Sequence, residues 1–160
     1  MLKAIMKNTY LFFTAVFLIV VIMISCEKDN TSEPDFISAK LENQNWDGRP
    51  EIIFDKETDT LSIRGVGNEQ VIVLNLKYTG EGIYNLEKIR AIYYTTVGGD
   101  VITNWYNLGK DNSSKVTITE FDTNEKIVKG DFQVSVLNST DELNFTNGKF
   151  KGIFREVTID

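Results

Sequence analysis

The stretch KVTITEFDTNEKIVKGDFQVSVL, residues 115–137, decides the fold class of this chain. Apolar residues recur at every second position on either side of a polar centre: Val116, Ile118, Phe132, Val134 and Val136. Such alternation is typical of a β-strand that buries one face and exposes the other. The centre, Asp122–Glu125, is rich in turn-forming residues. The stretch therefore predicts two β-strands joined by a turn.

The same alternation runs from Phe36 to the end of the chain, which predicts an all-β fold. Clusters of Gly, Asn and Asp separate the strands, among them Asp47-Gly48, Gly98-Gly99-Asp100 and Asn147-Gly148. We expect an antiparallel meander of about 8–10 strands. It must close as a barrel or fold as a two-sheet sandwich to protect its edges. Only Leu86–Ala91 is ambiguous between a strand and a short turn.

The N-terminus differs in kind from the rest of the chain. Lys3 and Lys7 precede an uncharged apolar run, Tyr10–Ile24, which ends at Ser25-Cys26. Basic residues, an apolar core and a small residue before the cut are the pattern of a secretory signal, here a signal helix within residues 1–25. Ser25-Cys26 resembles the lipobox of bacterial lipoproteins, which implies cleavage before Cys26 and lipidation of its sulfur. An uncleaved membrane anchor and an ordinary cleaved signal are the alternatives.

Three parts of the chain follow from this interpretation. Residues 1–25 are the signal peptide, residues 26–35 are the lipidated cysteine with a polar, flexible tether, and residues 36–160 are one all-β domain. Cys26 is the only cysteine, so its lipidation would leave no thiol in the mature domain. The chain also has no histidine. Cys-His pairs, Ser-His-Asp triads and histidine-ligated zinc sites are therefore excluded from it.

The charge of the chain limits its partners. The formal net charge is −6, from 17 basic and 23 acidic residues. Removal of residues 1–25 takes away Lys3 and Lys7 and no acid, so the mature chain has 15 basic residues against 23 acidic ones, a net charge of about −8. Such a domain repels nucleic acid, which we exclude as a partner. No cofactor is predicted.

Aromatic residues are the candidate ligand contacts. Tyr93-Tyr94 and Trp105-Tyr106 are adjacent pairs within expected strands, so one member of each pair must face outward. Trp46 lies in an expected turn, where it caps the core or lines a cleft. We select Trp46, Tyr94 and Trp105 as contacts for a glycan, lipid or protein ligand. The alternative is that these residues only cover the ends of the fold.

Two motifs between residues 55 and 66 are similar to sites with other chemistry. Alternate acids, beginning at Asp55, are typical of a calcium loop, but Thr60 stands where the loop needs glycine and Val66 where it needs glutamate. No metal site is predicted. Asp59-Thr60-Leu61 resembles an O-glycosylation site of Bacteroidota-type bacteria, with Thr60 as acceptor; the alternative is an ordinary turn residue.

Five segments are distinctive: SCEKD at residues 25–29, FISAKLENQNW at 36–46, GEGIYNLE at 80–87, KVTITEFDTNEKIVKGDFQVSVLN at 115–138 and LNFTNGKFKGIF at 143–154. Together they resemble a family of Bacteroidota-type lipoproteins of unknown function. The resemblance implies an exported, lipid-anchored protein with an all-β fold. It implies no catalytic or binding residue.

We therefore expect a protein attached to the bacterial outer membrane through Cys26, facing the periplasm or the cell exterior. The favoured function is a non-enzymatic binding module. The alternatives are a structural or assembly component of an envelope complex and, less favoured, a hydrolase that uses two carboxylates.

Overall fold

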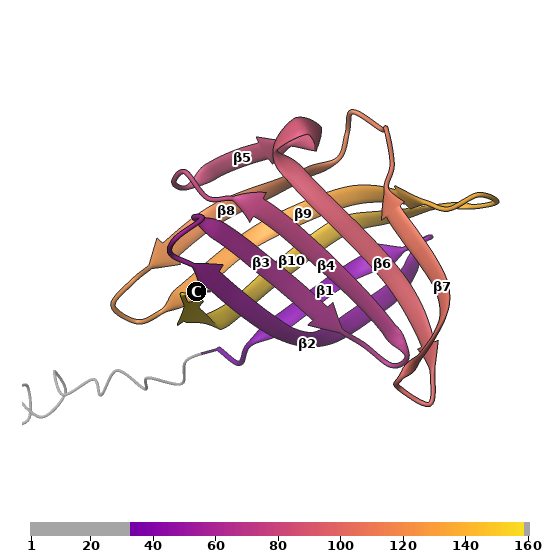
Figure 1. Cartoon of the computed structure of the whole chain (residues 1–160), viewed down its shortest axis with the longest axis horizontal. Helices are drawn as coiled ribbons and strands as arrows, with labels where there is room; N and C mark the ends of the chain where they lie inside the picture. The colour runs from indigo at the N-terminus through magenta and orange to yellow at the C-terminus, as the bar shows by residue number, and fades with distance from the viewer. Residues whose placement is uncertain (1–32, 159–160) are drawn as a thin grey trace, which may run out of the picture. The chain divides into compact units, whose positions relative to one another are not determined.

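The computed structural model of the chain describes residues 33–158, and that part is all-β, as predicted (Figure 1). The strands are β1 (Phe36–Leu41), β2 (Gln44–Asp55), β3 (Thr60–Val66), β4 (Gln70–Lys77), β5 (Gly82–Asn85), β6 (Ile89–Val97), β7 (Val101–Leu108), β8 (Lys115–Asp122), β9 (Ile127–Leu137) and β10 (Glu142–Val157). A short 3-10 helix, η1 (Leu86–Lys88), precedes β6 and resolves the ambiguous segment. Within residues 33–158 no helix is long and apolar enough to span a bilayer. The predicted signal helix and Cys26 lie outside the described residues.

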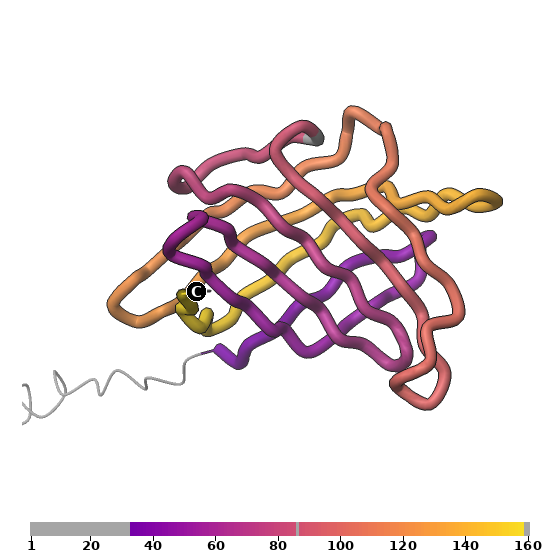
Figure 2. Tube along the Cα trace, in the orientation of Figure 1, coloured from indigo at the N-terminus to yellow at the C-terminus, as the bar shows by residue number. Residues whose placement is uncertain are grey.

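Eight strands form a closed ring of hydrogen-bonded neighbours, which the tube in Figure 2 traces. Around the ring the order is β1-β2-β3-β4-β6-β7-β9-β10, and β10 pairs with β1 again. The two remaining strands, β5 and β8, pair with each other, and β8 pairs with β9. Closure gives most strand edges a partner, which is how an all-β chain avoids pairing with other molecules.

The predicted meander is wrong in three places. First, β5 pairs with β8 and not with its neighbours in the chain. Second, β7 pairs with β9 and not with β8. Third, the end of β10 pairs with β2 in parallel, from Phe154 opposite Ile52 onward. The parallel pairing follows from the length of β10. This strand has 16 residues, and β1 begins only at Phe36, which lies opposite Lys151. Beyond Lys151, β10 has no β1 partner and pairs directly with β2.

Two glycine clusters expected at turns lie inside strands. Asp47-Gly48 is within β2, and Asn147-Gly148 is within β10 at an irregularity of its pairing with β9. A Cβ at Gly148 would lie 2.6 Å from the ring of Phe132. The absence of a side chain at Gly148 thus allows close packing against Phe132. The tip of the first hairpin is not at Asp47-Gly48 but at Glu42 and Asn43, which both have positive φ.

The interior of the ring is filled with side chains. Aliphatic residues from all around the ring, such as Ile63, Leu74 and Val128, are fully buried. Aromatic rings pack in two groups: Trp46, Tyr93, Tyr106, Phe132 and Phe145 form one, and Phe54, Tyr78, Phe121 and Phe154 form the other. The buried side chains form one continuous cluster, so the inside of the ring is a packed core.

Candidate recognition surface

Tyr94 and Trp105, two of the three predicted contacts, lie side by side on the outer face of the ring. They are directly opposite in the β6–β7 ladder, and their rings are stacked with centroids 5.5 Å apart and planes 9° apart. Their chain neighbours Tyr93 and Tyr106 point inward and are buried, as strand alternation requires. Trp105 remains 45% exposed, and its Nε1 donates a hydrogen bond to Asn107 Oδ1 at 3.2 Å.

An ion-pair network lies next to this stack on the outer face of the ring. Arg64 on β3 donates one hydrogen bond to the Tyr94 hydroxyl at 3.0 Å and another to Glu51 on β2 at 2.7 Å. The hydrogen bond to Tyr94 and the charge of Glu51 raise the pKa of Arg64. Partial burial alone would raise the pKa of Glu51, but the hydrogen bonds and charges of Arg49 and Arg64 lower it. Both groups therefore stay charged at neutral pH, and Arg64 orients the phenol of Tyr94.

The tip of the β6–β7 hairpin exposes three aliphatic side chains beside the stack. Val97, Val101 and Ile102 are each more than half exposed. Val97 lies opposite Val101, and the turn between them is made by Gly98 and Gly99 with positive φ. We call Tyr94, Val97, Val101, Ile102 and Trp105 together the hairpin surface.

Glu69, in the β3–β4 turn, fixes the hairpin to the ring. Its carbonyl accepts a hydrogen bond from the Thr96 N–H, and its carboxylate accepts one from the Gly98 N–H, both at 2.9 Å. The exposed apolar tip is therefore held in place by backbone and side-chain contacts.

One edge of β7 is open over most of its length. β7 pairs with β9 only through Asn107 and Leu108, while Gly109 donates a backbone hydrogen bond to Ser135 at 2.8 Å. On the side opposite β6, Val101–Tyr106 have no strand partner among the described residues. Unpaired backbone N–H and C=O groups along such an edge can pair with another chain.

The hairpin is almost without charge, although the chain is rich in charge. Between Arg90 and Lys110 the only charged residue is Asp100, in the turn. Sequence reasoning missed the exposed Val97, Val101 and Ile102, and this gap in the charge pattern is the signal that could have found them. An exposed apolar surface with few charged residues is typical of a site that contacts another protein.

The comparisons with known proteins identify the family of the chain but not an activity. The model of a domain of unknown function, DUF6252, matches residues 33–154. The chain belongs to the DUF6252 family. No curated protein and no solved structure matches it.

The DUF6252 match begins just before β1 and ends at Phe154 in β10, so it covers the closed ring and the entire hairpin surface. Cys26 lies before the match, and its lipidation stays a prediction. The prediction of an uncharacterised family with an all-β domain is thus confirmed. That its members are Bacteroidota-type lipoproteins stays a prediction.

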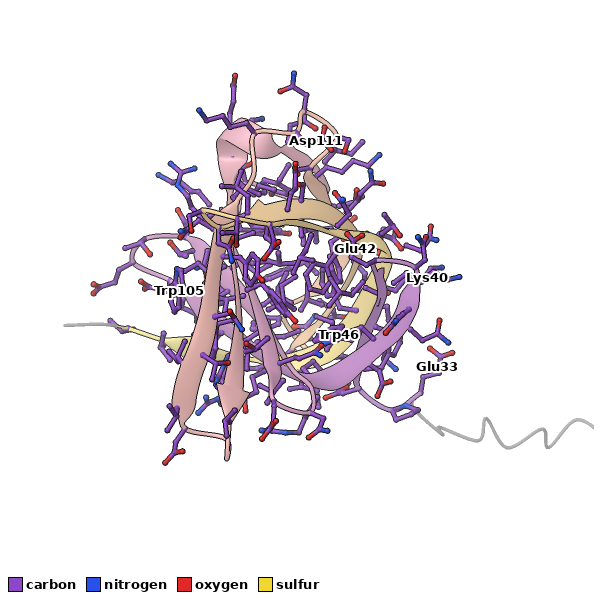
Figure 3. All side chains as sticks on the ribbon, turned by 90° about the vertical axis from the view of Figure 1, so that its right-hand side faces the viewer. Glu33, Lys40, Glu42, Trp46, Trp105 and Asp111 are labelled. Carbon is purple, nitrogen blue, oxygen red and sulfur yellow. The ribbon has the colours of Figure 1, made fainter. Side chains whose placement is uncertain are left out.

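Trp46 is separate from the other two predicted contacts. Its position in β2, and not in a turn, directs the indole into the ring, where it packs edge-on against Phe145 with centroids 5.7 Å apart. Figure 3 shows Trp46 within the ring and Trp105 beside the β6–β7 ribbons. Trp46 lines a pocket of about 260 Å³ together with Gln70 and Leu143. Its buried Nε1 has no hydrogen-bond partner among the described residues.

Thr60, the predicted glycosylation acceptor, lies at the start of β3 in a turn organised by Asp55. The Asp55 carboxylate accepts hydrogen bonds from the Thr58 hydroxyl at 2.6 Å and the Glu57 N–H at 3.0 Å, and these bonds lower its pKa. Thr60 Oγ1 is within hydrogen-bond distance of Thr58 Oγ1, at 2.8 Å. The segment with the alternating acids is thus a turn capped by Asp55, and modification of Thr60 stays a prediction.

Thr60 also lines an open groove of about 500 Å³ with Lys77, Lys88 and Arg90. Glu87 is its one acidic lining residue. The smaller pockets beside β9 and beside Trp46 likewise have one acid each, Asp131 and Glu42. These three pockets bring no carboxylate pair together, so the hydrolase hypothesis gains no support from them. Within residues 33–158 no group of three or more acidic side chains could hold a metal ion.

Proposed function

We propose that this chain is a non-enzymatic binding module of the bacterial outer membrane, anchored by lipid at Cys26, which docks a protein partner on its hairpin surface. The apolar run that ends at Ser25-Cys26 supports the anchor. The segments quoted above support an origin in Bacteroidota-type bacteria. The hairpin surface supports the binding role.

The observation that carries the proposal is the coincidence of three properties in one hairpin. Val97, Val101, Ile102 and Trp105 are exposed, the adjacent backbone edge has no partner in the part of the chain that the structure describes, and charge is nearly absent. Aromatic residues are enriched and charged residues are depleted at the centres of protein interfaces. We take the ring to be a barrel with a filled interior, which favours recognition at the surface over transport of a ligand inside.

Site-specific photo-crosslinking in cells that express the full chain tests the protein partner. A photoreactive amino acid replaces Ile102 in one variant and Ile83 in the other; both side chains are exposed and lie at strand positions, but Ile83 is on β5. We expect a discrete adduct from position 102 and none from position 83. Equal labelling from both positions, or none from position 102, would overturn the proposal. An adduct with one partner in a fixed stoichiometric ratio would favour the alternative function, a structural or assembly component of an envelope complex.

The anchor has its own test. Cells are grown with an alkyne-tagged fatty acid, and the wild-type chain is compared with Cys26→Ser. We expect label and membrane association in the wild type and loss of both in the variant. Label in the variant, or none in the wild type, would show that Cys26 is not the lipid attachment site.

A glycan is the second candidate ligand, because the stacked, partly exposed indole of Trp105 can hold the flat face of a sugar ring. A glycan array probed with the wild-type chain and with Trp105→Ala tests it. Binding that needs Trp105 supports this ligand, and an array without signal excludes it for the glycans present.

A further inference from the structure

We propose that the protein docked on the hairpin surface is a second copy of this chain, joined through the open edges of the two β7 strands. The inference rests on the proposed function, since it requires the hairpin to be a protein contact. It adds the identity of the partner and the geometry of the contact: an antiparallel seam between the Val101–Tyr106 segments, related by a two-fold axis.

The open edge of β7 lacks most of the usual protection against pairing. Natural edge strands are shortened, carry charges or proline, or contain a bulge. β7 has eight residues, none of them charged and none proline. Its one protective feature is a bulge at Thr103, where the pairing with β6 shifts. Such an edge is expected to be covered in the native protein.

The distribution of charge favours an approach of two copies along β7. The chain has a net charge of −6, so two copies repel each other in most orientations. The β6–β7 hairpin has only Asp100 as a charge, and that residue is in the turn, at the end of the seam. The hairpin also projects beyond the neighbouring β3–β4 turn (Figure 1). Two copies can therefore approach along β7 without bringing their acidic strands together.

The bulge at Thr103 makes the edge of β7 complementary to itself. Trp105 lies opposite Tyr94 and Ile102 opposite Thr96, so Ile102 and Trp105 share the outer face although three positions separate them. A two-fold axis between Thr103 and Asn104 sets Ile102 opposite Trp105 of the second copy. The same axis sets Val101 opposite the inward-facing Tyr106 of that copy. A β-branched residue across from an aromatic one is a favourable cross-strand pair.

The proposed contact between the two β7 strands is small, and this determines how the association of the two copies must be measured. Six residues on each chain are far fewer than the roughly 20–30 per side of a stable interface. We therefore expect dissociation on dilution. Attachment to a membrane would concentrate the copies and favour pairing. The test accordingly uses the full chain in cells.

The experiment is cysteine crosslinking between two differently tagged full chains made in the same cells. Both carry Thr103→Cys, close to the proposed axis, and a short bifunctional maleimide is added. We expect an adduct of twice the chain mass that contains both tags. Adding Ile102→Lys should reduce the adduct at least tenfold, whereas Ile83→Lys, an equally exposed control on β5, should leave it unchanged. Ile83→Cys in place of Thr103→Cys should give no adduct.

The outcomes separate this inference from the proposed function. Absence of the two-tag adduct, or equal loss with Ile102→Lys and Ile83→Lys, overturns the self-pairing. If the photo-crosslink from position 102 then captures a different protein, the proposed function stands with another partner. If neither experiment gives an adduct, both proposals are overturned.

Discussion

The phenol of Tyr94 and the indole of Trp105 stack across the β6–β7 ladder, 5.5 Å between ring centroids, and Arg64 holds the phenol from the other side. This arrangement gives the outer face an oriented aromatic pair. Trp105 is the outermost ring, because within residues 33–158 no strand pairs with β7 beyond it at this level. The pair thus contributes to stability while leaving an indole available for contact.

The first prediction concerns the energy of this pair. A double-mutant cycle with Tyr94→Ala, Trp105→Ala and the double variant should give a coupling energy of about 0.5–1 kcal/mol, as expected for aromatic cross-strand pairs. Chemical denaturation of the four proteins measures it. A coupling energy indistinguishable from zero would mean that the rings do not stack in solution.

The second prediction concerns Gly130 in β9, whose neighbours leave no room for a side chain. A Cβ there would overlap the Thr117 carbonyl oxygen and lie 2.5 Å from Phe150 Cζ. Gly130→Ala should therefore lower the free energy of unfolding by about 3 kcal/mol or more, as overpacking does at a rigid site. In Gly152→Ala the nearest atom is the mobile Cδ1 of Ile52, at 3.0 Å, so this control should cost clearly less. Thermal unfolding compares the two.

The fold class could be predicted from sequence because strand periodicity is local. The inward sets that include Ile63 and Leu74 are buried as the alternation required. Pairing between distant segments leaves no such local trace. The parallel contact of Phe154 with Ile52 depends on where β1 begins, and the pairing of β5 with β8 depends on the path of the ring.

The candidate site was predicted in part for a related reason. Alternation requires that one residue of Tyr93-Tyr94 and one of Trp105-Tyr106 face outward, and Tyr94 and Trp105 do so. That the two are directly opposite depends on the register of β6 and β7, which periodicity alone does not specify. The Asp47-Gly48 pair predicts a turn next to Trp46, but Gly48 lies inside the sheet, where it allows close approach to the backbone of Val66.

The third prediction distinguishes the two tryptophans by fluorescence, since Trp46 is 6% exposed and Trp105 45% exposed. With Trp46 as the only tryptophan, in Trp105→Phe, emission should be blue-shifted and resistant to acrylamide. With Trp105 alone, in Trp46→Phe, emission should be red-shifted and readily quenched by acrylamide. Similar quenching constants for the two variants would contradict the opposite orientations of these side chains. Far-UV circular dichroism confirms that each variant is folded.

The fourth prediction concerns alkaline pH and the buried phenol of Tyr93. Burial, with a smaller effect of Tyr106, raises the pKa of Tyr93 from the ordinary value of 10 to about 12. The unfolded chain loses this proton near pH 10 while the folded chain retains it, so the stabilising contribution is complete below pH 10 and is lost as pH rises toward 12. Two pKa units correspond to about 2.7 kcal/mol. Other groups titrate in the same range, so the quantity to measure is the difference between the wild type and Tyr93→Phe. The variant should lack this part of the decline in unfolding free energy between pH 10 and 12. Parallel declines in the two proteins would show that the phenol of Tyr93 ionises as freely in the folded chain as in the unfolded one.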